Sequence, residues 1–126
     1  MDKKRVLVID DSATVRQELS QILESIGFEV LQAQDGVAGL EAIHRHPDLG
    51  LVLCDVNMPR MTGIEMLSKL QSELPQHTFP VLMLTSEGQP ALIQEAKRLG
   101  AKGWLVKPFN PDHLAAVAKK FAGLPG

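Results

Sequence analysis

The sequence predicts an α/β protein in which a doubly wound, five-stranded parallel sheet carries helices on both faces. Short runs of apolar and β-branched residues alternate with segments whose apolar residues recur at helical spacing. Such alternation produces right-handed crossovers between parallel strands. The length of 126 residues and the hydrophobic fraction of 44% suit one compact core, so we expect residues 1–126 to form a single domain.

Five runs predict the strands, at residues 5–9, 28–33, 51–54, 80–84 and 103–106. The third run is apolar throughout, which is typical of a strand that is covered on both faces. It leads directly into Asp55, and a carboxylate at such a dry strand end is unfavourable unless it is paired. We therefore expect Asp55 to have partners from elsewhere in the chain.

Helical patterns fill the intervals between these strands. The first helix has an apolar face from Val15 to Ile26 and ends before Gly27, a residue that suits the left-handed turn after a helix. Capping signals mark the starts of two further helices, at Thr62 with Glu65 and at Asn110 with Pro111. Shorter apolar patterns predict the remaining helices near residues 36–45 and 89–99.

The charge balance and the cysteine content exclude several classes of protein. Lys and Arg number 13 against 15 Asp and Glu, so no overall basic field indicates a nucleic acid or an anionic membrane as partner. The lone cysteine, Cys54, excludes an internal disulfide and suits a reducing compartment. We find no signal peptide and no membrane-spanning stretch in the sequence, and we expect a soluble, cytoplasmic protein.

Polar side chains follow the predicted strands at their carboxyl ends, where parallel sheets bind ligands. They are Asp10 and Asp11 after the first strand, Asp55 after the third, Thr85 and Ser86 after the fourth, and Lys107 after the fifth. If these four strands are neighbours, three carboxylates, a hydroxyl and an ammonium group converge. Crowded carboxylates favour a hard divalent cation, and we expect Mg²⁺ there, with Mn²⁺ as the alternative ion. Asp55 is then the expected nucleophile, forming an aspartyl phosphate.

Four motifs occur in order along the chain: LVIDDS, CDVNMPRMTG, LTSE and VKPF. Together they resemble the receiver domain of bacterial response regulators, and they are most similar to single-domain receivers of the chemotaxis CheY type. The resemblance covers the whole chain. It implies a flavodoxin-like, CheY-like three-layer sandwich with strand order 2-1-3-4-5.

The resemblance also implies a role for each strand-end residue. Asp55 matches the phosphorylated aspartate, Asp11 a direct metal ligand, and Asp10 an acidic neighbour that acts largely through water. Asn57 matches the residue whose backbone carbonyl completes the metal site. Thr85 matches the hydroxyl that holds the phosphoryl group.

The last motif, VKPF, contributes the remaining phosphoryl-binding group. Lys107 matches the lysine that holds the phosphoryl group together with the hydroxyl of Thr85. The bond from Lys107 to Pro108 is typically cis in the family, although most X-Pro bonds are trans.

A phosphoryl group adds charge and strong acceptors, which implies a conformational switch. We expect Thr85 to swing towards the new oxygens and to open space for an aromatic ring on the last strand. Trp104 occupies that aromatic position, where the family more often has Tyr or Phe. We hypothesise that Trp104 reports or restricts the switch. Asn57 and Glu87 are expected to tune the lifetime of the phosphorylated state.

The expected partners follow from the same resemblance. A histidine kinase or phosphotransfer domain would donate the phosphoryl group, and the protein would catalyse its own phosphorylation and slow dephosphorylation rather than act as an enzyme. No output domain follows the last helix, so we expect the signal to leave by binding another protein. Lys97, Arg98 and Lys102, near Trp104, are the candidate surface for an acidic partner.

Three other functions share either these residues or this sheet topology. A phosphatase of the haloacid dehalogenase type typically has a second aspartate two residues after its nucleophile, where this chain has Asn57. A flavodoxin-like electron carrier would bring a flavin phosphate to Asp10 and Asp11, which repel it. A degenerate receiver that binds partners without being phosphorylated is the alternative function.

Overall fold

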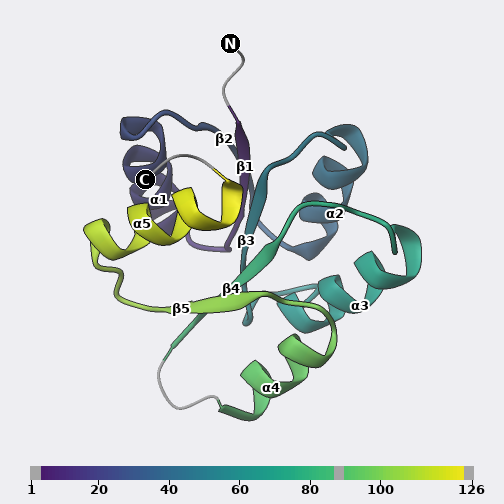
Figure 1. The fold of residues 1–126 in the computed structure, drawn as a ribbon. Coiled ribbons are helices and arrows are strands. Elements are labelled where there is room, and N and C mark those ends of the chain that lie inside the picture. Colours follow the sequence, from purple (N-terminus) through teal and green to yellow (C-terminus); the bar gives the residue numbers. More distant parts are fainter. Residues whose placement is uncertain (1–3, 87–89, 124–126) are drawn as a thin grey trace.

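The computed structural model describes residues 4–86 and 90–123 and shows strands and helices alternating along the chain (Figure 1). The strands are β1 (Arg5–Ile9), β2 (Glu29–Ala33), β3 (Leu51–Asp55), β4 (Val81–Thr85) and β5 (Gly103–Val106). The helices are α1 (Ala13–Ser25), α2 (Gly36–Arg45), α3 (Gly63–Glu73), α4 (Pro90–Arg98) and α5 (Pro111–Ala122). Each predicted strand is confirmed, with its ends shifted by one residue at most.

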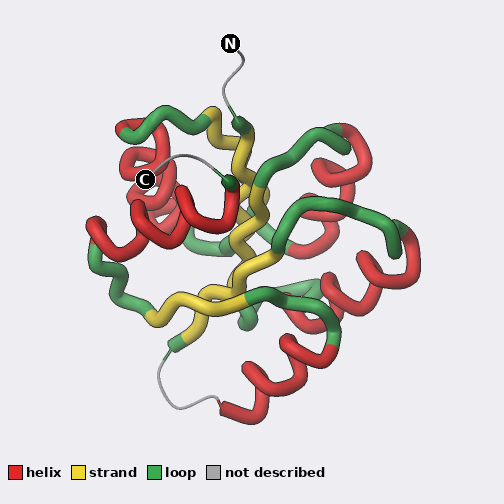
Figure 2. The backbone as a smooth tube through the Cα atoms, viewed as in Figure 1, coloured by secondary structure: helices red, strands yellow, loops and turns green. Residues whose placement is uncertain are grey.

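The five strands form one parallel sheet in the order β2-β1-β3-β4-β5, which confirms the predicted fold. The sheet runs through the middle of the molecule, with helices on either side of it (Figure 2). The register pairs Ile9 with Cys54 and Thr85 with Val106, so these strands end at a common edge. The chain reverses direction across the sheet between β1 and β3, and ligands bind at such a point in open α/β sheets.

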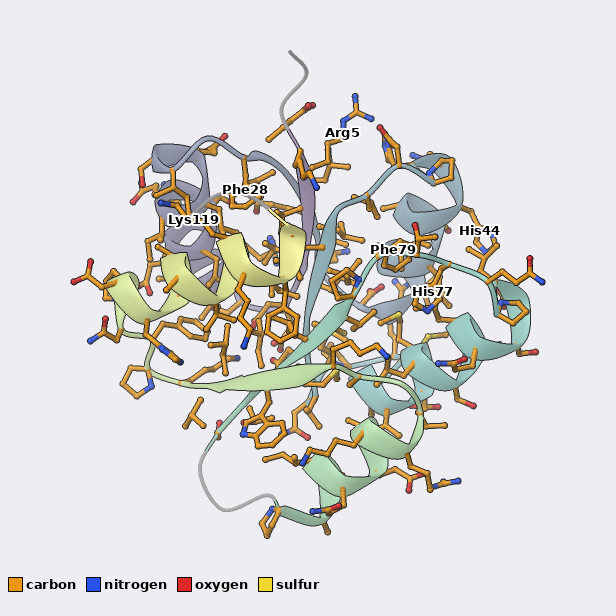
Figure 3. All side chains as sticks on the ribbon, in the orientation of Figure 1. Arg5, Phe28, His44, His77, Phe79 and Lys119 are labelled. Atoms are coloured by element: carbon orange, nitrogen blue, oxygen red, sulfur yellow. The ribbon has the colours of Figure 1, made fainter. Side chains whose placement is uncertain are left out.

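The core lies on both faces of the sheet because successive side chains along each strand point to opposite faces. On one face, Leu7 and Ile9 of β1 pack with residues of α2, α3 and α4. On the other face, Val6 and Val8 pack with α1 and α5, and Phe28 fills the same layer (Figure 3). All five residues of β3 are buried, as the continuous apolar run predicted.

Local hydrogen bonds fix where the helices begin. The predicted capping box at the start of α3 is present, with both Thr62 and Glu65 bonded to the backbone of the other. Asn110 caps α5 as predicted. Asp35, in the loop after β2, caps α2 by accepting from the backbone N–H of Ala38 at 2.9 Å. Among the described residues, every helix is too short or too polar to cross a membrane.

The start of α3 is packed tightly against the end of β3, where Gly63 lies. A methyl group at Gly63 would overlap the Asp55 carbonyl oxygen and lie 3.0 Å from the Cα atom of Val56. We expect Gly63→Ala to lower the free energy of unfolding by about 1–3 kcal/mol, because backbone cannot move aside cheaply. Urea denaturation measures this change.

Gly50→Ala is the matched control, because a methyl group there lies at least 3.5 Å from its neighbours. We expect it to change the free energy of unfolding by less than about 0.5 kcal/mol. Equal stability of the two variants would contradict the tight packing at Gly63.

Candidate functional site

Three aspartates meet at the carboxyl ends of β1 and β3. One carboxylate oxygen from each of Asp10, Asp11 and Asp55 lies within 4.8 Å of the other two. Asp10 and Asp55 are buried, with 0% and 6% of their surfaces exposed, whereas Asp11 is exposed. They are the one group of potential metal ligands found among the described His, Cys, Asp and Glu residues. The three carboxylates that were expected to converge therefore lie together in the fold.

Lys107 connects β5 to this acidic group. Its Nζ atom donates to Oδ2 of Asp10 at 2.8 Å and to Oδ2 of Asp55 at 3.2 Å. The backbone N–H of Lys107 donates to the carbonyl oxygen of Thr85 at 2.8 Å, which ties the loop after β5 to the end of β4. The bond from Lys107 to Pro108 is cis, as the resemblance implied.

Burial and charge act in opposite directions on the Asp55 carboxylate. Burial raises its pKa most, and the neighbouring charge of Asp10 raises it further. The Lys107 ammonium and the Asn57 backbone N–H, which donates to Oδ1 at 3.2 Å, lower the pKa. The pKa of Asp55 remains above its ordinary value. The ionised carboxylate is therefore incompletely compensated, and further positive charge at this edge stabilises it.

The Lys107 ammonium stays protonated despite its partial burial. Burial lowers its pKa, but the hydrogen bond with Asp10 and the charges of Asp55 and Asp10 outweigh that effect. The pKa of Lys107 is raised above its ordinary value. Lys107 is thus a fixed cation and hydrogen-bond donor beside two carboxylates.

Thr85 contributes an unsatisfied hydroxyl group at the end of β4. The residue is 1% exposed, and its Oγ1 atom has no hydrogen-bond partner within the described residues. Buried polar groups are nearly always hydrogen-bonded, so this exception needs a reason. A ligand oxygen arriving at the strand ends would supply a partner.

Cys54 precedes Asp55 in β3 and is completely buried. Burial, followed by the charges of Asp55 and Asp10, raises the pKa of its thiol strongly. The thiolate is the reactive form of cysteine, so this side chain is an inert part of the core.

Trp104 lies on the surface of β5 and is 40% exposed. The Nζ atom of Lys97 lies 4.3 Å from the centre of its ring, at a distance typical of a cation–π interaction. Val106, two residues further along β5, is also exposed. Trp104 and Val106 form the apolar part of a surface to which Lys97 and exposed Lys102 add positive charge.

Other predicted residues lie at or near this edge with different surroundings. Asn57 is exposed in the loop after β3. Arg98 is bonded to Glu95 of its own helix, with 3.2 Å between Nε and Oε2, so its charge is partly neutralised. Glu87 lies outside the described residues.

Two arginines near the site were not singled out from the sequence. Arg60 has a φ of 65°, in the left-handed region, and its Nε atom lies 3.3 Å from Oδ2 of buried Asp35. Arg16 of α1 donates from Nη1 to the carbonyl oxygen of Asp10 at 2.7 Å. A cation in the first turn of a helix opposes the helix dipole, and this unfavourable position is the signal that could have identified Arg16.

The four histidines take no part in this site. His44 of α2 bonds Glu73 of α3 at 2.8 Å, and the His77 ring stacks on Phe79 with 4.5 Å between ring centres (Figure 3). These contacts hold the helix layer and the connection before β4 together.

The donor set at the strand ends fits a hard divalent cation. All three side chains offer carboxylate oxygens, the ligand type that Mg²⁺ prefers, and histidine and cysteine ligands are absent from the group. Buried like charges also gain from a cation placed among them. The residues present are thus suited to a magnesium site.

Comparisons with known proteins agree with this geometry. A sequence model of the response regulator receiver domain matches residues 6–119. Chemotaxis protein CheY1 of Helicobacter pylori is 35% identical over 111 residues, which cover 87% of this chain and 90% of that protein. Chemotaxis protein CheY of Thermotoga maritima is 34% identical over 119 residues, which cover 93% and 96%.

A solved structure also matches nearly the whole chain. Chemotaxis protein CheY4 of Vibrio cholerae superposes with a TM-score of 0.87 at 39% identity, covering 95% of this chain and 99% of that one. The fold, the strand-end carboxylates and the sequence matches lead to one family. The chain belongs to the response regulator receiver domains and is a CheY-like member of that family.

Proposed function

We propose that this protein is a phosphorylation-activated switch of a two-component system, in which Asp55 accepts a phosphoryl group from a histidine kinase or phosphotransfer domain. The observation that supports it best is the meeting of Asp10, Asp11 and Asp55 at one edge, with Lys107 donating to two of them. If these carboxylates were only a solvated surface cluster, burial of one of them and a lysine shared by two would not be expected.

The chemistry follows from the positions of these groups. An oxygen of the Asp55 carboxylate attacks the phosphorus atom, and the bond from phosphorus to the donor's leaving atom breaks. The Lys107 ammonium, 3.2 Å from Asp55, is placed to donate to an arriving phosphoryl oxygen. The Thr85 hydroxyl provides a second donor. Both groups reduce the charge that accumulates on the transferred group.

The metal ligands in this proposal are the carboxylates of Asp11 and Asp55 and the backbone carbonyl of Asn57, with Asp10 acting through water. Mg²⁺ is the proposed ion, and Mn²⁺ is the alternative. When bound, the cation supplies positive charge opposite the phosphoryl oxygens. Asp11 is the exposed member of the set, so it can exchange water for a cation without opening the core.

The switch in this proposal begins at Thr85. Its hydroxyl is buried without a partner in the described structure, and a phosphoryl group on Asp55 would offer it an acceptor. Movement of Thr85 would leave space into which the exposed ring of Trp104 can turn. Asn57 and Glu87 are proposed to set the lifetime of the phosphorylated state.

The outgoing signal is proposed to pass through the surface around Trp104. Lys97 lies over the exposed ring of Trp104, and exposed Lys102 is two residues before Trp104 in the chain, which suits an acidic protein partner with an apolar anchor. Arg98 belongs to the same surface, but its pairing with Glu95 leaves it less charge to offer. We propose a protein rather than a nucleic acid or a membrane as the receiver of the signal.

We expect Asp55→Asn to reduce phosphorylation to less than about one tenth of the wild-type level, because an amide is a poor nucleophile. The protein is incubated with acetyl phosphate and Mg²⁺, and the intact mass is measured for a gain of one phosphoryl group. Removal of Mg²⁺ with a chelator should abolish the gain as well.

Asp112→Asn is the control for this experiment, because Asp112 is exposed in the first turn of α5. It should gain the phosphoryl mass normally. Wild-type protein that gains no mass would favour a degenerate receiver, which binds partners without phosphorylation.

We expect Thr85→Val to leave the unphosphorylated protein as stable as the wild type or more stable by up to about 1 kcal/mol, because the variant removes a buried hydroxyl that lacks a partner. Thr62→Val is the contrasting variant. It removes the oxygen that accepts from the Glu65 N–H at 3.1 Å, and it should destabilise by about 1 kcal/mol. Urea unfolding compares the two, and a large loss at Thr85 would mean that its hydroxyl is bonded after all.

We expect the emission of Trp104 to shift to shorter wavelength when beryllium fluoride and Mg²⁺ mimic the phosphoryl group, because the 40% exposed ring moves into a drier environment. Trp104 is the only tryptophan in the chain, so the signal is unambiguous. Asp55→Asn should show no shift. An unchanged wild-type spectrum in the presence of a stable adduct would exclude inward rotation of the ring.

A further inference from the structure

A chain of side-chain hydrogen bonds leads from Ser20 of α1, through Gln32 and Arg16, to the backbone of Asp10. The buried Ser20 hydroxyl of α1 accepts from Nε2 of Gln32 on β2 at 3.1 Å. Oε1 of Gln32 accepts from Nε of Arg16 at 3.1 Å, and Nη1 of Arg16 donates to the Asp10 carbonyl oxygen at 2.7 Å. The guanidinium is thus held at two points of one rigid plane.

The Asp10 carbonyl lies just beyond the last residue of β1, in a residue that is 0% exposed. The other polar atoms of Asp10 are also bonded. Its N–H donates to Ala33, Oδ1 accepts from the Ser12 N–H at 2.9 Å, and Oδ2 accepts from Lys107. Arg16 supplies the bond that completes this set. Asp10 is consequently fixed in position at both its backbone and its side chain.

The Arg16 contact also determines the direction of the next residue. The Asp10 carbonyl and the Asp11 N–H belong to one planar peptide unit. A donor that holds the oxygen therefore fixes the plane from which the Asp11 Cα atom and carboxylate project. Asp11 is exposed, so it has less packing of its own to orient it.

The position of Arg16 in its helix argues for a purpose other than helix stability. Arg16 is the fourth residue of α1, and a positive charge in the first turn faces the positive end of the helix dipole. The arginine is unfavourable for the helix, but it is well placed for the loop that carries Asp10 and Asp11.

We propose that Arg16, oriented by Gln32, is a positioning residue that sets Asp11 in the direction required to bind the divalent cation. The proposal rests on the proposed function, because it assumes that the carboxylates hold Mg²⁺. Arg16 itself contacts neither the cation nor the phosphoryl group. Groups that orient metal ligands without contacting the metal commonly affect metal affinity strongly.

The test compares two variants that keep the charge of the site. Arg16→Lys retains the positive charge but loses the planar guanidinium that donates to both Gln32 and Asp10. Gln32→Met leaves Arg16 in place but removes the side-chain oxygen that accepts from it. We expect Arg16→Lys to raise the Mg²⁺ dissociation constant by about 3–10-fold and Gln32→Met by a smaller factor in the same direction. Isothermal titration calorimetry with Mg²⁺ alone measures both. Gln17→Met, on the exposed side of the same helix, is the control and should bind as the wild type does.

A second measurement separates positioning from general destabilisation. With acetyl phosphate as donor, the Mg²⁺ concentration for half-maximal phosphorylation should rise by the same factor as the dissociation constant. The rate at saturating Mg²⁺ should stay within about twofold of wild type, because the metal, once bound, restores the ligand geometry. A merely structural role would lower the rate at all Mg²⁺ concentrations.

Two results would overturn the inference. Unchanged Mg²⁺ affinity in both variants, with normal binding by the wild type, would refute the role of Arg16 and leave the proposed function intact. A reduced rate that saturating Mg²⁺ does not restore would do the same. Absence of Mg²⁺ binding by the wild type would instead refute the proposed function on which this inference rests. If Arg16→Lys fails to fold, Gln32→Met alone decides.

Discussion

The arrangement of charges at the carboxyl ends of the strands depends on one ammonium group that two buried carboxylates share. Asp10 and Asp55 are brought together because β1 and β3 are neighbours in the sheet, and they repel each other in a dry environment. Lys107 offsets that repulsion from β5, on the far side of β4. Without Lys107, the two buried carboxylates would keep backbone N–H donors but lose the ammonium that they share, and an unpaired buried charge is strongly destabilising. The loop after β5 is therefore as much a part of the site as the acidic loops.

Two groups at the same edge, the Asp55 carboxylate and the Thr85 hydroxyl, are incompletely compensated. Asp55 has a raised pKa, and the Thr85 hydroxyl is buried without a partner in the described structure. A cation bound there would offset the charge of Asp55, and a group rich in acceptors would give the Thr85 hydroxyl a partner. Such a ligand would stabilise whichever conformation satisfies these atoms best and would shift the population towards it.

Much of this arrangement could be predicted from the sequence because it depends on strand periodicity. The continuous apolar run before Asp55 predicted a strand buried on both faces, and parallel strands bring Asp10, Asp11, Thr85 and Lys107 to one edge. The position of Arg16 near the start of a helix could single out the residue, but its contact with Asp10 could not be predicted, because it depends on side-chain rotamers across two elements. The outward position of Trp104 and the left-handed backbone of Arg60 likewise depend on tertiary packing.

The burial of Cys54 gives the molecule an internal indicator of its own opening. The thiol lies one residue before Asp55, in the central strand, and burial keeps it protonated. Its side chain lies in the apolar layer between the sheet and helices α2 and α3, so a thiol reagent can reach it only when that layer opens, and its labelling rate reports how often that happens. Because Asp55 follows Cys54 in β3, a group bound at the strand ends that stabilises this layer would slow the modification of a residue that it never touches.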